Sequence, residues 1–509
     1  MENTNEKQSI FKVIGASSLG TLIEWYDFYI FGSLAVIIGK QLFPSDAGAS
    51  ALINTLAIFA AGFIVRPFGA LVFGRLGDLI GRKSTFLLTL VLMGGSTFLI
   101  GLIPSYATIG YAAPILVLIL RLVQGLALGG EYGGAATYVA EHAPANRRGY
   151  FTSWIQTTAT LGLFLSIGVI VTAKNIIGAE AFADWGWRIP FLISILLVVV
   201  SIYIRLKMHE SPLFSKLKAE GNISKNPLKE SFSNKANFKM VLLALFGATM
   251  GQGVIWYTGQ FYAQSFLENS VYLAFNESRY IILWAILFAT PFFVVFGSWS
   301  DRVGRKWIML TGMLLGIICY RPIYQHFLDK TNVAEFAKTE LVSEAEPVVK
   351  RAVLANQTDS LITTTVLKTL KDGATFKQVS VDTVFADVTK PHAAGKTVYI
   401  DKTLSGSNFW LFVFLVFIQI IFVTMVYGPI AAFLVELFPT KIRYTSMSLP
   451  YHIGNGVFGG LVPFIATLIA SYSGSTPLSG LWYPIGIATL SLIIGAIYIN
   501  NKIDENVND

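Results

Sequence analysis

The sequence has few charged residues for its length. Of its 509 residues, 54% are hydrophobic and only 13% are charged, whereas soluble globular proteins carry about 25% charged residues. The mean hydropathy of +0.60 agrees with this deficit. The formal net charge is +8, but the basic residues lie in short loops between apolar runs, where they anchor and orient spans. The composition therefore excludes an ordinary soluble domain, favours a chain embedded in the lipid bilayer, and predicts no nucleic-acid partner.

Cysteine and the motifs of covalent chemistry are also scarce. Cys319 is the single cysteine and lies in an apolar run, which excludes a disulfide framework and a cysteine metal site. The five histidines are scattered without metal-ligand spacing. Neither a phosphate-binding G-x-x-x-x-G-K-[ST] loop nor an H-E-x-x-H motif occurs, and no Ser/His/Asp set stands in a soluble context. We therefore expect no enzyme activity, no metal and no cofactor.

What the sequence does contain is a series of long apolar runs. A membrane-spanning helix needs about 20 mostly apolar residues. Runs of this kind lie near residues 13–40, 52–76, 84–104, 110–140, 150–174, 188–207, 239–267, 277–300, 307–324, 408–436, 444–472 and 479–500. They predict an all-α membrane protein of about twelve helices in two halves. We divide the chain into an N-terminal half (1–207), a linker (208–238), the first part of a C-terminal half (239–324), an insertion (325–405) and the remainder of the C-terminal half with the tail (406–509).

The orientation follows from the connections between the spans. Those on one side hold many basic residues: Arg75, Arg82, Lys83, Arg147, Arg148, Lys216, Lys218, Lys225, Lys229, Arg302, Arg305, Lys306, Lys441 and Arg443. The opposite connections near 104–114 and 472–480 hold none. By the positive-inside rule, both termini are expected in the cytoplasm and the 325–405 insertion outside it. The expected location is a plasma membrane, which the family resemblance described below implies to be bacterial.

The 325–405 insertion differs from the rest of the chain because it is rich in charge. Thr375–Val381 alternates polar and apolar residues like a strand, and Lys371–Gly373 before it is typical of a turn. We expect a small extracytoplasmic subdomain of mixed helix and strand. The alternative is a long flexible loop, although structureless loops of this length are uncommon in compact folds.

One ten-residue pattern occurs twice, each time between the second and third apolar runs of its half. Gly74–Lys83 and Gly297–Lys306 share G-x-x-x-D-x-x-G-R-K. The glycines allow a tight chain reversal, and Asp78 and Asp301 are suited to pairing with a helix N-terminus. The remaining shared positions that we single out are Gly81, Arg82, Lys83, Gly304 and Arg305. Two copies at equivalent places indicate an internal duplication.

Charged residues also occur inside the predicted spans, where charge is costly and each case is a functional hypothesis. Glu24 and Asp27 are spaced i, i+3 and so share one face of the first span. Two neighbouring acids in a low dielectric cannot both ionise easily, so at least one of them should readily hold a proton. A proton-coupling site requires such a carboxylate. The alternative is permanent pairing with an arginine of another span. Arg66 lies in mid-span before a proline, and we expect it to bind a carboxylate, either of the protein or of a substrate anion.

The fourth span contributes three further candidates. Arg121, Gln124 and Glu131 fall within about three helical turns, and the glycines around Glu131 allow close helix packing. We expect Arg121 and Gln124 to contact substrate, and Arg121 and Glu131 to take part in proton coupling. Other polar or aromatic residues of the spans either line a cavity or pack: Tyr26, Gln156, Gln252, Trp256, Tyr257, Gln260, Tyr427, His452 and Asn455. Of these, we single out Tyr26, Gln156, Gln252 and Tyr257 as candidates for substrate contact.

These pieces resemble the major facilitator superfamily, and within it the metabolite:proton symporter family of α-ketoglutarate, shikimate, citrate and proline/betaine permeases. The resemblance covers both halves but not the insertion. It rests on the repeated loop pattern and on residues 24–29, 63–69, 121–134, 185–191, 210–214 and 436–445.

The resemblance implies two six-helix bundles with alternating access and uptake driven by the proton gradient. It implies that Asp78 helps to close the cytoplasmic side by contacting Thr445 and nearby arginines. The other positions expected in this gate are Gly74, Gly81, Arg82, Lys83, Asp301, Gly304 and Arg305. It also implies proton coupling at Arg121 and anion binding at Arg66. The second copy departs from the first, with Ser298 where the first has Arg75. The last residues show no heptads, which disfavours an osmosensor of the betaine-permease type.

We therefore expect a proton-coupled symporter that works as a monomer and takes up a small organic anion, a mono- or dicarboxylate. One alternative is uptake of a zwitterion such as proline or betaine, for which Trp256 and Tyr257 are a weak sign of an aromatic cage. Another is a membrane sensor or binding protein that uses the 325–405 insertion as its receptor.

Overall fold

A computed structural model describes residues 10–44, 49–207, 209–332, 339–353, 360–385, 395, 397–472 and 474–501. Within these residues, twelve helical stretches are long and apolar enough to cross a membrane. This confirms the predicted fold class. The two termini, which we expect in the cytoplasm, lie outside the described residues.

Six of these stretches belong to the N-terminal half. They are α1 (Ile10–Leu42), α2 (Ala49–Ile64) followed by α3 (Arg66–Ile80), α4 (Arg82–Ile100), α6 (Ala112–His142), α7 (Arg148–Gln156) followed by α8 (Thr158–Ile177), and α10 (Arg188–Leu206). The short helix α5 (Tyr106–Ile109) lies between α4 and α6. The second span breaks between α2 and α3, where Pro67 follows Arg66 and lacks the N–H that a continuous helix needs.

The C-terminal half supplies the other six. The seventh span joins α13 (Lys235–Ala244), η4 (Leu245–Thr249), α14 (Met250–Tyr257), η5 (Thr258–Tyr262) and α15 (Ala263–Asn269). It is followed by α16 (Phe275–Val303), α17 (Arg305–Lys330), α19 (Gly406–Tyr427) with α20 (Ile430–Leu437), α21 (Arg443–His452) with η6 (Ile453–Gly459) and α22 (Val462–Ser471), and η7 (Pro477–Leu481) with α23 (Trp482–Tyr498). Between the halves lie α11 (Pro212–Ala219) and α12 (Pro227–Phe232).

Glycines let helices of the N-terminal half approach closely. A Cβ at Gly125 would lie 2.1 Å from the carbonyl oxygen of Gly62, and one at Gly129 would lie 2.2 Å from that of Arg66. Any larger residue at either position would therefore push α6 away from α2 and α3. This packing holds Arg66 against the fourth span.

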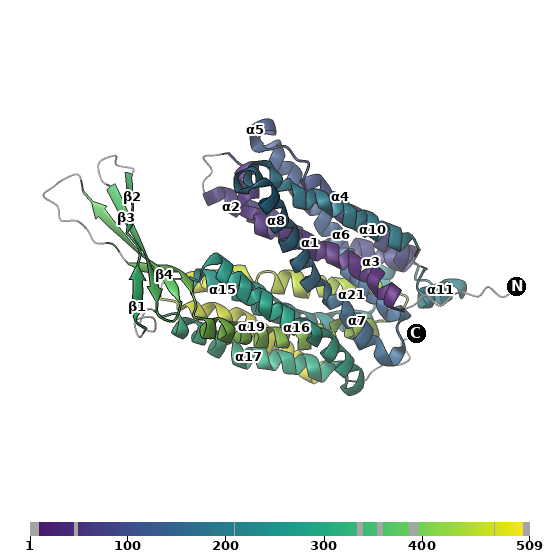
Figure 1. The fold of residues 1–509 in the computed structure, drawn as a ribbon. Coiled ribbons are helices and arrows are strands. Elements are labelled where there is room, and N and C mark those ends of the chain that lie inside the picture. Colours follow the sequence, from purple (N-terminus) through teal and green to yellow (C-terminus); the bar gives the residue numbers. More distant parts are fainter. Residues whose placement is uncertain are drawn as a thin grey trace.

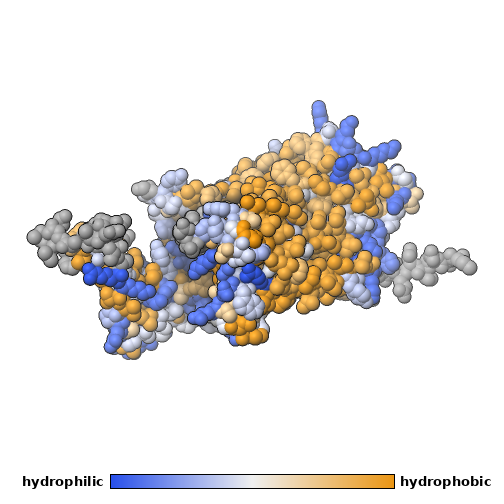
Figure 2. Space-filling model, turned by 90° about the horizontal axis from the view of Figure 1, so that it is seen from above, coloured by the Kyte–Doolittle hydropathy of each residue, from blue (hydrophilic) through white to orange (hydrophobic). Residues whose placement is uncertain are grey.

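The two halves form two helix bundles that are joined at one end and separate towards the other (Figure 1). At the joined end, α3 packs on α21 and α7 packs on α16. We call it the basic end, because both repeated loops lie there. The other end carries the strands and is called the insertion end. The surface between them is largely apolar, with hydrophilic residues at both ends (Figure 2), as expected for helices that face lipid.

The insertion contains a five-stranded antiparallel sheet, which confirms the strands predicted for it. Its strands are β1 (Leu341–Glu344), β2 (Val348–Val353), β3 (Ser360–Leu370), β4 (Thr375–Val384) and β5 (Val398–Thr403). The order is β1-β3-β4-β5, and β2 also pairs with β3. The predicted turn joins β3 to β4, with Gly373 in the left-handed region at φ 86°. Between Leu341 and Thr403 the described residues form strands, turns and irregular segments but no helix, so the expected helix is not among them.

The sheet is attached to the C-terminal bundle through β5. The backbone N–H of Lys402 donates to the carbonyl of Tyr272 at 3.0 Å, and the N–H of Ala274 donates to the carbonyl of Lys402 at 2.8 Å. Lys402 Nζ also donates to the carbonyl of Thr331 at 2.9 Å. These bonds join β5 to the segment between α15 and α16, so the sheet is a continuation of the C-terminal half (Figure 1).

Candidate functional site

The first polar group of the site is an ion pair between the first and second spans. Arg66 Nη1 lies 3.0 Å from Glu24 Oε1, and each side chain is 11% exposed. Arg66 reaches this position because it is the first residue of α3, directly after the break in the second span. Its Cζ also lies 4.4 Å from the ring centroid of Phe63. The two opposite charges that the sequence places in different spans therefore meet.

This ion pair forms part of the wall of a small chamber where the two halves meet. The N-terminal half contributes Thr21, Glu24, Trp25, Phe28, Phe63, Arg66, Tyr132, Ile155, Gln156 and Thr158, and the C-terminal half contributes Tyr257, Tyr427, Tyr451 and Asn455. We call this space the central chamber. Its free volume is only about 10 Å³, which is room for about one water molecule. The structure therefore shows the chamber closed.

Aromatic side chains from the two halves close the chamber against one another. The rings of Tyr132 and Tyr451 stack with their centroids 3.8 Å apart, and those of Trp25 and Trp256 lie 4.9 Å apart. The hydroxyl groups of Tyr427 and Tyr451 are hydrogen-bonded at 2.8 Å. A solute that binds between these rings would contact apolar faces that carry partial negative charge and attract cationic groups.

A second buried ion pair lies beside the first. Arg121 Nη1 is 2.6 Å from Asp27 Oδ2, with side chains 4% and 3% exposed. Arg121 also donates to the amide oxygen of Gln124, whose Nε2 donates to Thr97 at 2.8 Å. A cavity of about 10 Å³ borders both ion pairs.

Several polar atoms around this cavity have no hydrogen-bond partner in the described part of the chain. They are Asp27 Oδ1, Arg66 Nε, Arg121 Nε and Arg121 Nη2. Buried polar groups are normally hydrogen-bonded. The three arginine nitrogens can therefore donate hydrogen bonds to a ligand, and Asp27 Oδ1 can accept a proton or a hydrogen bond; a rearranged ion pair could also use these atoms.

The third predicted carboxylate lies elsewhere in the N-terminal half. Glu131 is fully buried and pairs with Arg205 of α10 at 2.6 Å. Thr89 Oγ1 donates to its other oxygen at 2.9 Å. Glu131 does not line the central chamber. Arg205 was not among the predicted site residues, although it is an arginine at the end of a predicted span.

The remaining candidates fall into two groups. Gln156 and Tyr257 line the chamber, and Gln156 Nε2 donates to the hydroxyl of Tyr132 at 2.8 Å. Gln252 lies behind the chamber wall, where its Nε2 donates to Asn455 at 3.3 Å. Tyr26 points away from the chamber, because its hydroxyl donates to the carbonyl of Pro190 at 2.7 Å.

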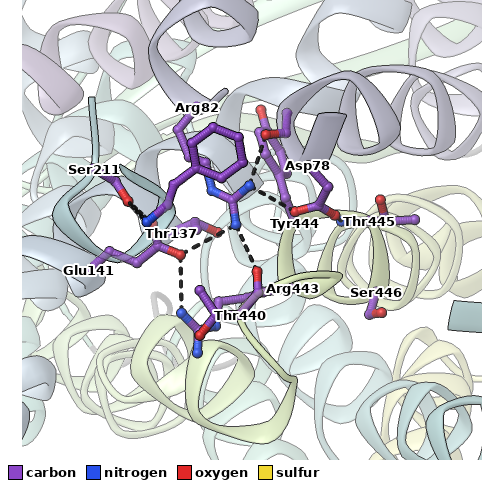
Figure 3. A network of polar contacts seen from close by, with 12 residues as sticks. Asp78, Arg82, Thr137, Glu141, Ser211, Thr440, Arg443, Tyr444, Thr445 and Ser446 are labelled. Carbon is purple, nitrogen blue, oxygen red and sulfur yellow. Dashed lines mark hydrogen bonds and ion pairs between the residues drawn. The ribbon is translucent and has the colours of Figure 1, made fainter. Parts of the chain in front are cut away.

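The loop 74–83 takes part in a buried network at the basic end, which we call the first network (Figure 3). Asp78 Oδ2 accepts a hydrogen bond from the backbone N–H of Thr445 at 2.8 Å, which is the partner expected from the sequence. Asp78 Oδ1 lies 3.0 Å from Arg82 Nη1, and Arg82 Nη2 donates to the carbonyl of Thr440 at 2.9 Å. Because Thr445 stands in the first turn of α21, the carboxylate meets the positive end of that helix.

Glu141 completes the first network with an ion pair between the two halves. Its Oε1 lies 3.0 Å from Arg443 Nη1 and 3.4 Å from Arg82 Nη2. The side chains of Glu141 and Arg82 are 0% exposed. Ser211 donates to the other carboxylate oxygen.

The loop 297–306 forms an equivalent second network. Asp301 accepts hydrogen bonds from the backbone N–H groups of Gly149 and Tyr150, both at 2.8 Å, at the first turn of α7. Arg305 pairs with Asp301 at 2.7 Å and with Glu436 at 2.8 Å. Each repeated aspartate therefore meets the N-terminus of a helix from the opposite half.

Glycines allow the two loops to turn, and a lysine of the first loop is hydrogen-bonded to the end of α10. Gly81 and Gly304 have φ angles of 118° and 93°, a conformation that residues with a Cβ rarely adopt. A Cβ at Gly74 would lie 2.9 Å from the Cα of Thr445. Lys83 Nζ donates to the carbonyl of Leu206 at 3.0 Å.

Sequence reasoning did not identify Glu141 and Glu436. A signal for them exists, because Glu141–Arg148 and Glu436–Arg443 share the pattern E-x-x-P-x-x-x-R. It is a second internal repeat, and it supplies a carboxylate to the arginine of each loop.

Comparison with known proteins gives a consistent result. Residues 12–221 match the family model described as "Sugar (and other) transporter". The chain is 30% identical to the inner membrane metabolite transport protein YhjE of Escherichia coli, over 91% of this chain and 88% of that protein. It is 28% identical to the alpha-ketoglutarate permease of the same organism, over 97% and 94%.

The similarity to a proline/betaine transporter is closer but shorter. The chain is 38% identical to that protein of Salmonella typhimurium over 60% of this chain, and the match spans 62% of the transporter's own length. Among solved structures, the proton:xylose symporter XylE bound to 6-bromo-6-deoxy-D-glucose has a TM-score of 0.62 at 15% identity, with 96% of both chains covered. XylE from E. coli in a partially occluded inward open conformation has a TM-score of 0.59 at 16% identity, with 97% of this chain and 98% of that chain covered.

These structures share the fold, and the sequence relatives are transporters. With its two bundles, its paired loop networks and its match along nine tenths of a metabolite transport protein, the chain is a multi-pass membrane transporter that belongs to the major facilitator superfamily.

Proposed function

We propose that the chain is a proton-coupled importer of a small carboxylate-bearing metabolite, acting as a monomer in the lipid bilayer. The basic end faces the cytoplasm and the insertion end faces the outside, in accord with the basic residues of the loops. The two bundles rock about the central chamber, so that it opens first to one side and then to the other. The two networks hold the cytoplasmic side closed in the present structure.

The observation that carries this proposal is the 3.0 Å ion pair of Glu24 and Arg66 in the wall of the closed chamber. Removing one partner of a buried ion pair leaves the other charge uncompensated, which costs about 3–5 kcal/mol. A proton neutralises the Glu24 carboxylate, and the carboxylate of a solute compensates the charge of Arg66, so the two ligands together avoid that cost. Each ligand therefore makes binding of the other more favourable, which is the requirement for symport.

The transport cycle follows from this exchange. When the chamber is open to the outside, a proton binds the Glu24 carboxylate and the Arg66 guanidinium binds the solute carboxylate in its place. The bundles then close outside and open inside. Loss of the solute to the cytoplasm lets Arg66 return to Glu24, which releases its proton to the same side.

The other charged residues support this exchange in different ways. Arg121 and Asp27 border the same small cavity as Glu24 and Arg66, and we assign them the second step of proton transfer, with Gln124 orienting Arg121. Glu131 braces α6 against α10 through Arg205. Asp78 and Asp301 close the cytoplasmic side.

The chamber favours a solute with one carboxylate. Arg66 is the only arginine that the described residues contribute to its lining, and a dicarboxylate would leave its second negative charge without a partner there. The first candidate is therefore a monocarboxylate anion. The second is a zwitterion such as betaine, which the aromatic faces of Trp25, Tyr257 and Tyr451 favour through cation–π contact.

Uptake into proteoliposomes tests the proposal. Labelled propionate, glycine betaine and α-ketoglutarate are compared with and without an inward proton gradient. We expect concentrative uptake of one of the first two, abolished by a protonophore and by Arg66→Gln. Glu24→Gln should keep solute exchange but lose the response to the gradient.

Arg321→Gln is the matched control, because this arginine stacks on Trp482 and lines neither the chamber nor the small cavity. Its uptake should equal that of the unaltered protein. Gradient-driven uptake that survives in Arg66→Gln would contradict the proposal.

A further inference from the structure

A second cavity lies between the bundles on the insertion side of the chamber. Its volume is about 300 Å³, at the lower end of the range for ligand pockets. Phe28 and Phe59 line it from the N-terminal half, and Gln260, Phe261, Glu268 and Arg279 line it from the C-terminal half. We call it the outer cavity, following the orientation proposed above.

The outer cavity contains one carboxylate and one guanidinium, which are hydrogen-bonded to each other. Arg279 Nη1 lies 2.8 Å from Glu268 Oε1, and the side chains are 32% and 24% exposed. The same oxygen accepts hydrogen bonds from Ser278 at 2.8 Å and from Gln264 at 3.2 Å. Arg279 Nη1 also donates to the carbonyl of Phe275 at 2.9 Å.

These contacts leave one side of each charged group unused. All three hydrogen bonds to Glu268 go to Oε1, and both donated by Arg279 come from Nη1. Within the described residues, Glu268 Oε2 and Arg279 Nη2 and Nε therefore have no hydrogen-bond partner, and one face of the Arg279 guanidinium stacks on Phe275, with Cζ 3.1 Å from the ring centroid. If the Glu268–Arg279 ion pair served only to hold α15 and α16 together, it would not need to border a cavity of this size.

We propose that the outer cavity is a second solute site, and that its ligand is a small zwitterion with a cationic nitrogen and a carboxylate. The nitrogen contacts Glu268 Oε2 and the aromatic faces of Phe28 and Phe261. The carboxylate binds the free edge of Arg279. The pair has no net charge, so it suits a dipolar solute better than an anion.

The outer cavity leads towards the central chamber. Phe28 lines both spaces, and its ring lies 4.9 Å from that of Phe261 in an edge-on contact. These two rings, one from each half, separate the outer site from Arg66. The solute binds outside first and passes between them when the bundles move. This inference rests on the importer function and, of the two candidate solutes proposed above, selects the zwitterion.

Equilibrium dialysis of the purified full-length protein with labelled glycine betaine tests this site. We expect two molecules bound per chain in the unaltered protein. Arg66→Gln and Arg279→Gln should each bind one, and the double variant Arg66→Gln/Arg279→Gln should bind none. Glu268→Gln should weaken the outer site at least tenfold. Choline, which lacks the carboxylate, should bind it at least tenfold more weakly than glycine betaine.

Arg321→Gln added to Arg66→Gln is the matched control and should keep one molecule bound. One molecule bound in both the unaltered protein and Arg279→Gln overturns the outer site, as does no binding of betaine at all. Arg279→Gln alone decides the question if Arg66→Gln does not fold. Failure of the importer function is distinguishable, because it appears as uptake that ignores the proton gradient.

Discussion

The two halves of the molecule are alike at the basic end and unlike at its centre. Each half contributes one repeated loop whose aspartate meets the N-terminus of a helix from the other half. Away from that end, the N-terminal half holds three buried ion pairs. Glu24–Arg66 lines the central chamber, Asp27–Arg121 borders the small cavity beside it, and Glu131–Arg205 lies elsewhere in the bundle. Among the described residues, the C-terminal half supplies tyrosines and Asn455 to the chamber instead. The two halves thus share the loop networks of the basic end, whereas among the described residues the charged groups that line the central chamber all belong to the N-terminal half.

The largest effect is expected where the halves differ most. Arg121→Gln leaves Asp27 buried without its ion-pair partner, and should lower the free energy of unfolding by about 3–5 kcal/mol. Gln252→Ala in the C-terminal half removes one long hydrogen bond to Asn455, and should cost about 0.5–1.5 kcal/mol. Thermal unfolding of the purified variants measures both.

The double variant Asp27→Asn/Arg121→Gln separates stability from function. It replaces both charges, so it should recover part of the lost stability without recovering gradient-driven uptake. Equal losses in Arg121→Gln and Gln252→Ala would show that the two halves do not differ in this respect.

The second prediction compares the two networks. Asp301→Ala removes two hydrogen bonds between the halves, whereas Asp78→Ala removes one and leaves Glu141–Arg443 and Arg82–Thr440 in place. Hydrogen bonds to charged groups contribute about 1.5–3 kcal/mol each. Both variants should open the cytoplasmic side more often, with the larger effect, at least about tenfold, in Asp301→Ala.

A buried reporter in α21 measures this opening. Ser448→Cys, in a background with Cys319→Ser, is labelled by a membrane-impermeant maleimide added at the cytoplasmic side. Faster labelling in Asp78→Ala than in Asp301→Ala would reverse the ranking of the two networks.

The third prediction concerns the contribution of the C-terminal half to the chamber. Tyr451→Phe removes the hydroxyl group that is bonded to Tyr427 at 2.8 Å and accepts a hydrogen bond from Asn455 Nδ2 at 3.4 Å, but it keeps the ring that stacks on Tyr132. The second bond is long and weak, so the loss is close to that of one neutral hydrogen bond, about 0.5–1.5 kcal/mol. The half-saturation concentration for uptake should therefore change by less than about tenfold, while the proton dependence stays as in the unaltered protein. Loss of coupling would place the proton pathway in both halves.

The smallest effect is expected in the insertion, which only the C-terminal half carries. Burial lowers the pKa of Lys402 to about 8, from an ordinary value of 10.5. The unfolded chain therefore holds more protons on this residue between pH 8 and 10.5, and stability rises with pH in that interval. Protection of β5 amides from hydrogen exchange, corrected for the intrinsic rate, should increase from pH 8 to pH 10. Lys402→Met should remove this increase, and an unchanged pH profile in that variant would exclude Lys402 as its origin.

The sequence was sufficient to predict most of the framework. Long apolar runs specify the spans directly, since a bilayer admits few alternatives to helices. The repeated loop and the pairing of Asp78 with Thr445 also followed from the residues and the family resemblance. The strand predicted at Thr375–Val381 lies within β4.

The sequence could not assign partners to the charges. Sequence alone left the partner of Glu24 and Asp27 open between a coupling site and a permanent arginine pair, because the helix rotation that brings Arg66 and Arg121 to them depends on packing between spans. Glu131 was expected to take part in proton coupling like Glu24, yet packing directs it to Arg205, which no sequence pattern singled out. The outer cavity depends on the angle between the bundles, which no local pattern encodes.

The central claim is that a proton on Glu24 frees Arg66 for the solute. It is tested most directly by proton uptake when the transported solute, propionate or glycine betaine, binds the purified protein in weakly buffered solution at neutral pH. The account predicts uptake of about one proton per solute bound in the unaltered protein and none in Glu24→Gln. Equal proton uptake by both proteins would contradict it.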